Sequence, residues 1–168
     1  MKALSFIFSY LFLPQAAADV VEPEIPLTLE AKKCTLNKNM RTILCVDDDA
    51  DDREIIGMVI KKIDSNYHVV HAENGLEAHT YLNAAKQNGN YPCLIILDIN
   101  MPVMDGKETL VELRKDEVLR KIPVAMFTTS TSHADKTFFL ELGVEMVTKP
   151  ADYSTITEEV EKLLTHCA

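Results

Sequence analysis

The sequence has no cluster of basic residues, and its acids outnumber its basic side chains. Its 168 residues include 26 aspartates and glutamates against 17 lysines and arginines, which gives a net charge of −9. Residues 40–168 carry the whole excess, 22 acids against 13 basic residues, because residues 1–39 contain four of each. DNA-binding surfaces concentrate positive charge, so this balance argues against nucleic acid as a direct partner.

Several short motifs are also missing. Nothing resembles a P-loop or a Gly-rich dinucleotide-binding turn, so a bound nucleotide is not indicated. The four cysteines (Cys34, Cys45, Cys93 and Cys167) show no C-x-x-C spacing. Cys45 lies inside an apolar run and Cys93 begins another, which favours reduced, buried thiols over disulfides or a zinc site.

Residues 1–39 lack an apolar run long enough to cross a membrane. Residues 3–13 are apolar, follow a lysine and precede three alanines, which is the form of a secretory leader but too short for a membrane span. Residues 21–39 contain two prolines and show no clear period. We predict that residues 1–39 are a leader-like or linker segment, disordered or the product of a mis-called start, and that residues 40–168 form the domain.

From residue 40 onward, short apolar runs alternate with amphipathic stretches. The runs predict strands at 42–46, 67–71, 93–97, 124–128 and 145–148. The stretches between and after them predict helices at 51–63, 75–86, 106–116, 133–142 and 153–166. Strands that alternate with helices are typical of βαβ units, so we expect an α/β fold with a parallel sheet covered on both faces.

Five carboxylates crowd into the segment CVDDDADD at residues 45–52. Acids favour the first turn of a helix, so Asp49 is predicted as an N-cap, with Asp51 and Asp52 in the first turn. Asp47 and Asp48 remain, either as part of a solvated acidic loop or as ligands of a cation. An EF-hand fits poorly because its required glycine and glutamate are absent, whereas two acids at a strand end suit Mg²⁺.

The ends of three more predicted strands supply further polar groups. Asp98 follows the third strand, Thr128 ends the fourth and Lys149 follows the fifth. In parallel sheets the carboxyl ends of the strands form the ligand-binding edge, so these groups should meet Asp47 and Asp48 there. Asp98 could then attack phosphorus, with Mg²⁺, Lys149 and Thr128 stabilising the charge of the phosphoryl group.

Residues 40–168 resemble the response-regulator receiver domains of two-component signalling. The motifs that match occur in the family's order: ILCVDDD (43–49), AENGLEA (72–78), LIILDINMPVMDG (94–106), IPVAMFTT (122–129) and VTKP (147–150). The resemblance implies a doubly wound, flavodoxin-like (βα)5 sheet with five helices. It also implies that Asp98 accepts phosphate from a phosphohistidine of a histidine kinase or phosphotransfer protein.

The resemblance assigns the other site residues as well. Mg²⁺ would bind Asp48, Asp98 and the backbone carbonyl of Asn100, and would bind Asp47 through water. Thr128 and Lys149 would contact the phosphoryl group, and the Lys149-Pro150 peptide bond would be cis. The protein would be a stoichiometric acceptor rather than an enzyme, with slow self-dephosphorylation possible.

The sequence departs from the family at three positions, one directly after the fourth predicted strand and two in or after the fifth. Met146 stands where many members have Tyr or Phe, Ala151 where many have Phe, and Thr129 where a smaller residue is common. These changes put the family's aromatic switch in doubt, but not phosphorylation. Because the last predicted helix ends about where the chain does, we expect output by protein binding, through the face formed by helix 133–142, strand 145–148 and helix 153–166.

Two other functions remain open. A Mg²⁺-dependent phosphohydrolase with Asp98 as nucleophile would typically carry a second carboxylate two residues later, where this chain has Asn100. A receiver-like binding module that never takes phosphate fits poorly with the complete set of acids, Thr128 and Lys149. We expect the working protein to start at Met40 and to be cytoplasmic, without a membrane contact, because phosphotransfer from an ATP-fed kinase takes place in the cytosol.

Overall fold

The computed structural model describes residues 40–167, in which five parallel strands form one sheet. The strands are β1 (Arg41–Val46), β2 (Tyr67–Ala72), β3 (Leu94–Leu97), β4 (Val124–Thr128) and β5 (Glu145–Thr148). They lie in the order β2-β1-β3-β4-β5, and every adjacent pair is parallel. This is the strand order of flavodoxin-like sheets, so the predicted fold class is confirmed.

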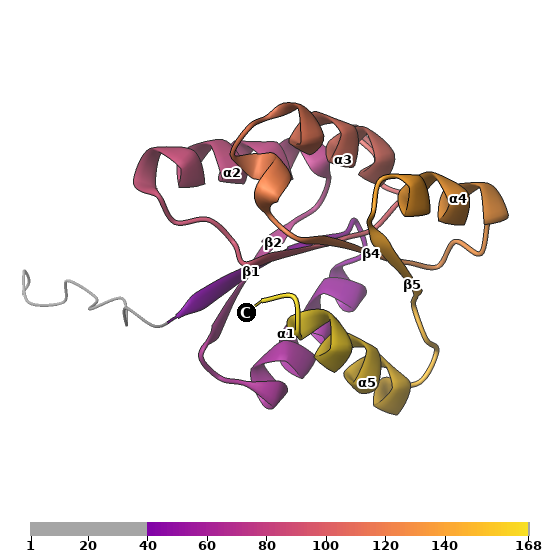
Figure 1. Cartoon of the computed structure of the whole chain (residues 1–168). Coiled ribbons are helices and arrows are strands. Elements are labelled where there is room, and N and C mark those ends of the chain that lie inside the picture. The colour runs from indigo at the N-terminus through magenta and orange to yellow at the C-terminus, as the bar shows by residue number, and fades with distance from the viewer. Residues whose placement is uncertain (1–39, 168) are drawn as a thin grey trace, which may run out of the picture. The chain divides into compact units, whose positions relative to one another are not determined.

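Helices cover both faces of this sheet. They are α1 (Ala50–Ile63), α2 (Gly75–Asn88), α3 (Gly106–Lys115), α4 (His133–Glu141) and α5 (Tyr153–Leu164), with a short 3-10 turn, η1 (Leu119–Lys121). Helices α2, α3 and α4 lie on one face, and α1 and α5 lie on the other (Figure 1). The predicted bounds of helices and strands differ from these by at most two residues.

The side chains of the central strands divide between two cores. In β1, Leu44 and Val46 pack under α2 and α3, whereas Ile43 and Cys45 pack against α1 and α5. The same alternation runs through β3, where all four residues are buried. Successive side chains of a strand point to opposite faces, so a sheet covered on both faces needs apolar residues at every position. This requirement explains the continuous apolar runs.

Each helix begins at a side chain that caps its free N–H groups. Asp49 accepts hydrogen bonds from the backbone N–H groups of Asp51 (2.8 Å) and Asp52 (3.4 Å), which confirms it as the N-cap of α1. Asp105 and Glu108 form a capping box at the start of α3. The caps fix where each loop after a strand ends, and these loops carry the candidate site.

The structure corrects the interpretation of two cysteines. Cys93 and Cys167 form a disulfide, with their Cα atoms 5.0 Å apart, although 74 residues separate them in sequence. Cys45 is free and buried, as predicted, and burial raises the pKa of its thiol to about 12. Local spacing could not reveal the pair, because the turn after α5 and the residue before β3 meet only in the folded chain.

A second correction concerns the Lys149-Pro150 peptide bond. The bond is trans, as are all peptide bonds in the part of the chain that the structure describes, so the predicted cis bond is wrong. Trans is the lower-energy form even before proline, by about 0.5–1 kcal/mol. The predictions for residues 1–39 lie outside the described residues. Within residues 40–167, no helix is both long enough and apolar enough to cross a membrane.

Candidate functional site

Two buried aspartates extend the central strands beyond their last apolar residues. The backbone N–H of Asp47 donates to the carbonyl of Ala72 at 3.1 Å, and that of Asp98 donates to the carbonyl of Val46 at 2.9 Å. Asp47 is 2% exposed and Asp98 is 6% exposed. The ladders on both sides of β1 therefore place these carboxyl groups side by side at the carboxyl edge of the sheet.

Asp48 completes a cluster of three carboxylates. One oxygen from each of Asp47, Asp48 and Asp98 lies within 4.8 Å of the others, and Asp48 is exposed to solvent. Three like charges this close repel one another unless a cation compensates them. Oxygen ligands and access to water suit a hard divalent cation, which keeps several waters when it binds. The side chains therefore fit a divalent metal.

Lys149 supplies the positive charge of the site. Its ammonium donates to Asp47 at 2.6 Å and lies 3.8 Å from Asp98. Burial acts to lower the pKa of Lys149, but the bonds to Asp47 and Asp52 outweigh burial and raise this pKa above its usual value. Burial also raises the pKa of Asp47, against the effect of Lys149. The ammonium is thus held charged between carboxylates.

Asp52 has a second role that sequence reasoning missed. Besides its place in the first turn of α1, its carboxylate accepts a hydrogen bond from Lys149 at 2.7 Å. Arg53 was also missed: its guanidinium donates to the backbone carbonyl of Asp47 at 2.6 Å. Neither contact has a local signal. Lys149 lies 97 residues from Asp52, and an arginine at this position is equally compatible with a solvated side chain.

The remaining predicted residues lie at the same edge of the sheet. Thr128 is fully buried, and its backbone carbonyl accepts a hydrogen bond from the Lys149 N–H at 2.8 Å. Its hydroxyl oxygen accepts the N–H of Ser130 at 3.2 Å. Asn100 is exposed in the loop between β3 and α3. Its carbonyl as a metal ligand, like the roles of the other site residues, stays a prediction.

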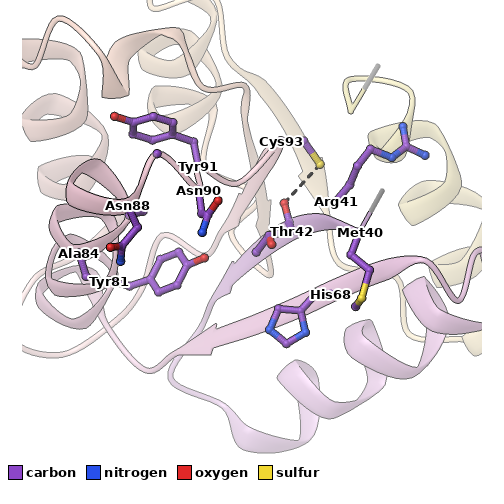
Figure 2. A pocket seen from close by; sticks show the side chains of 12 residues that line it. Met40, Arg41, Thr42, His68, Tyr81, Ala84, Asn88, Asn90, Tyr91 and Cys93 are labelled. Carbon is purple, nitrogen blue, oxygen red and sulfur yellow. Dashed lines mark hydrogen bonds between the residues drawn. The ribbon is translucent and has the colours of Figure 1, made fainter. Parts of the chain in front are cut away.

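A cavity of about 620 Å³ lies at the opposite edge of the sheet. Its walls come from the first residues of β1 and β2 and from the end of α2, and they include Tyr81, Tyr91 and His68 (Figure 2). The Cys93 sulfur lies 3.3 Å from the carbonyl oxygen of Thr42, so it can donate there when the disulfide is reduced (Figure 2). No predicted site residue lines this cavity.

Fold and site together define a doubly wound parallel α/β protein with clustered acids and a lysine beyond the ends of its strands. The family model of the response regulator receiver domain matches residues 43–161. The chain therefore belongs to the response regulator receiver family.

Curated relatives show the same family. The chain is 34% identical over 109 residues to the response regulator Rcp1 of Synechocystis, a match that covers 62% of this chain and 72% of Rcp1. It is 32% identical over 129 residues to the chemotaxis protein CheY-3 of Vibrio cholerae, covering 76% of this chain and 94% of CheY-3. The match covers only 45% of the phosphate regulon regulator PhoB of Pseudomonas aeruginosa.

Solved structures agree with these relatives. The phosphorylated cyanobacterial phytochrome response regulator RcpA superposes with a TM-score of 0.68 and 31% identity, over 74% of this chain and 91% of RcpA. The Mn²⁺-bound form of Rcp1 gives a TM-score of 0.67 at 30% identity, over 74% of this chain and 92% of Rcp1.

Proposed function

We propose that the chain is a phosphoacceptor response regulator: Asp98 takes a phosphoryl group from the phosphohistidine of a histidine kinase or phosphotransfer protein. One observation carries the proposal. A buried carboxylate, Asp98, lies beside a buried ammonium, Lys149, and within reach of two further carboxylates. The phosphorylated form of its relative RcpA supports the proposal.

The two oxygens of Asp98 differ in their contacts. Oδ1 accepts the Ile99 N–H at 2.7 Å, whereas Oδ2 lies toward Lys149. A carboxylate oxygen attacks phosphorus, the P–N bond of the phosphohistidine breaks, and its electron pair stays on the imidazole nitrogen. The product is an acyl phosphate on Asp98, whose added negative charge Lys149 and Thr128 stabilise by charge-assisted hydrogen bonds.

Asp48, Asp98 and the carbonyl of Asn100 would hold Mg²⁺, with Asp47 acting through water. When bound, the ion neutralises negative charge that the carboxylates and the phosphoryl oxygens bring together. The beryllofluoride complex of TrrA from Thermotoga maritima was solved with Mg²⁺, and Rcp1 with Mn²⁺, which supports a divalent ion here. The chain then acts as a stoichiometric acceptor of the phosphoryl group.

Intact mass spectrometry tests the proposal. With acetyl phosphate and Mg²⁺, the protein should gain the mass of one phosphoryl group, and Asp98→Asn should gain none. Asp64→Asn, which changes a carboxylate outside the site, should gain as much as the parent. Catalytic turnover of phosphate esters would instead favour the phosphohydrolase, and neither gain nor turnover would favour a binding module without phosphorylation.

Thermal unfolding tests the metal independently of phosphorylation. Mg²⁺ should raise the Tm of the parent, because an ion that binds only the native state stabilises it. Without Mg²⁺, Asp98→Asn should unfold at the same temperature as the parent or slightly higher, since it removes one of three mutually repelling carboxylates. A parent Tm that stays the same in millimolar Mg²⁺ would count against the metal site.

We also propose that output is protein binding through the face formed by α4, β5 and α5. Met146 in β5 is half-buried and packs against the same core as Phe138 of α4. Its flexible thioether should couple Thr128 to this face less tightly than an aromatic ring would. Met146→Tyr should therefore enlarge the beryllofluoride-dependent change in the NMR spectrum of residues 133–164, and an equal or smaller change would contradict this.

We place the working protein in the cytoplasm, starting at Met40, because its phosphoryl donor is fed by ATP. The Cys93–Cys167 disulfide argues for an exported protein instead, since disulfides are rare in the cytosol and common in exported proteins. N-terminal sequencing of the native protein decides between them. A terminus at Met40 in the cytosolic fraction is the expected result, and a terminus near Asp19 in an exported fraction would refute it.

A further inference from the structure

The loop after β4 is held by a continuous path of hydrogen bonds that starts at Thr128 and ends on α3. The Ser130 N–H donates to the Thr128 hydroxyl oxygen at 3.2 Å, and the Ser130 hydroxyl donates to Asp135 Oδ2 at 2.7 Å. The other oxygen of Asp135 lies 2.5 Å from the ammonium of Lys107. Residues from β4, its loop, α4 and α3 are thus joined in one path.

Burial and charge strengthen the hydrogen bonds of this path. Thr128 is fully buried and Asp135 is 9% exposed, so water replaces these partners poorly. Lys107, followed by Ser130, lowers the pKa of Asp135, which keeps it charged and strengthens both of its bonds. Ser132 ties the same turn together, because its hydroxyl accepts the Asp135 N–H at 3.4 Å as the N-cap of α4.

Resting on the function proposed above, we propose that Ser130, Asp135 and Lys107 are positioning residues that transmit a shift of the Thr128 hydroxyl to the first turn of α4. When that hydroxyl turns to donate to a phosphoryl oxygen on Asp98, its oxygen moves relative to the Ser130 N–H. Ser130 is half-buried, and an N–H that loses its acceptor away from bulk water is destabilising, so Ser130 follows the hydroxyl. Its own hydroxyl then displaces Asp135.

The path ends at a surface feature that a partner can sense. Lys107 lies 5.8 Å from the centre of the Phe138 ring, and both line a groove of about 450 Å³ between α3 and α4. A displaced Asp135 shifts the ammonium, and with it the polar wall of this groove. The flexible thioether of Met146 couples Thr128 to the output face only weakly. The directed, charge-assisted hydrogen bonds of Asp135 couple Thr128 to α4 more tightly. The output face therefore receives the signal through α4 first.

NMR of the full chain with beryllofluoride and Mg²⁺ tests the relay. In the parent, the phosphoryl mimic should shift the resonances of Asp98 and Ile99 and also those of Val111 and Phe138 in the groove. Ser130→Ala and Lys107→Met should keep the shifts at Asp98 and Ile99 but lose those in the groove. Lys115→Met is the matched control, because it removes an α3 ammonium whose exposed partner is Glu112.

The outcomes separate the relay from the function on which it rests. Groove shifts that persist unchanged in Ser130→Ala and Lys107→Met, with the mimic bound, overturn the relay alone. Groove shifts lost equally in Lys115→Met overturn it too, since any α3 charge would then suffice. A parent with no shift at Asp98 in the presence of the mimic overturns the proposed function, and the relay with it. Loss restricted to the two relay variants supports the proposal.

Discussion

At the scale of single residues, Lys149 provides the positive charge that compensates the carboxylates of the site. Its side chain is 9% exposed and touches Asp47 and Asp52, with Asp98 nearby. A buried carboxylate without a partner lowers the free energy of unfolding, whereas an exposed ion pair adds little to it. The same side chain that is proposed to stabilise the phosphoryl group therefore also stabilises the fold when no cation is bound.

We expect Lys149→Met to lower the free energy of unfolding by roughly 3 kcal/mol without divalent cations, because it leaves two buried carboxylates unpaired. Mg²⁺ should recover part of this loss by taking over the compensating charge. Urea unfolding with and without Mg²⁺ measures both effects. Lys162→Met, which breaks an exposed pair with Glu159, is the control and should cost at most about 0.5 kcal/mol. Equal losses in the two variants would contradict the argument.

At the scale of elements, the start of α3 is fitted closely against the site. A methyl group at Gly106 would overlap the backbone carbonyl oxygen of Asp98 and would lie 2.9 Å from Cα of Ile99. Because backbone cannot move aside as a flexible side chain can, we expect Gly106→Ala to destabilise the protein by about 1–3 kcal/mol or more. Gly89→Ala is the control, since its Cβ meets no atom and only its positive φ of 71° opposes alanine. A Gly106→Ala variant no less stable than Gly89→Ala, by urea unfolding, would refute the close fit.

The start of α5 gives a pH-dependent prediction. Asp152 caps the helix, and hydrogen bonds from Ser154 and Thr155 lower its pKa to about 2 from an ordinary value of 3.8. A carboxylate with a lowered folded-state pKa stabilises the protein above its unfolded pKa, and this stabilisation disappears as the pH falls toward 2. Asp152→Asn keeps a capping oxygen that does not titrate. The Tm difference between parent and variant should therefore shrink between pH 5 and pH 2, and a constant difference would contradict the cap's charge effect.

At the scale of the whole molecule, the Cys93–Cys167 disulfide ties the end of the described chain to the central sheet. It closes a loop of 74 residues that contains β3, β4, β5 and the helices α3 to α5. Loop-closure entropy of the unfolded chain predicts that a crosslink of this span adds about 4 kcal/mol to the free energy of unfolding. More than half of the domain is therefore constrained by one bond between elements that lie far apart in sequence.

We expect Cys167→Ser to unfold at a lower denaturant concentration than the oxidised parent, by an amount equivalent to about 4 kcal/mol. In the presence of a reductant, parent and variant should unfold together, because neither then carries the crosslink. Urea titrations with and without reductant measure this, with non-reducing mass spectrometry to verify the disulfide. A parent whose stability is the same with and without reductant would show that the bond does not contribute.

Local patterns predicted the elements and most of the candidate site. The apolar runs and helical spacing located every strand and α-helix of residues 40–167 within two residues but not the short η1, and the motif around Asp98 placed the chain in its family. The N-cap role of Asp49 was likewise readable, because capping depends on residues within three positions. Long-range contacts were not readable in this way: the pairing of Asp52 with Lys149 and the path from Ser130 to Lys107 join segments that have no sequence relation.

The sequence by itself determined the alternation of strands and helices and the acids and lysine that follow the strand ends, because periodicity and capping act over a few residues. Tertiary structure alone decided which distant groups meet. Packing between distant elements brought Cys93 to Cys167 and Lys149 to Asp52. The meeting of Lys149 with Asp47 and Asp98 already followed from their places at the strand ends. Such pairs form only when the sheet and its helices assemble, and neither periodicity nor the order of strand ends specifies which side chains of distant helices and loops touch.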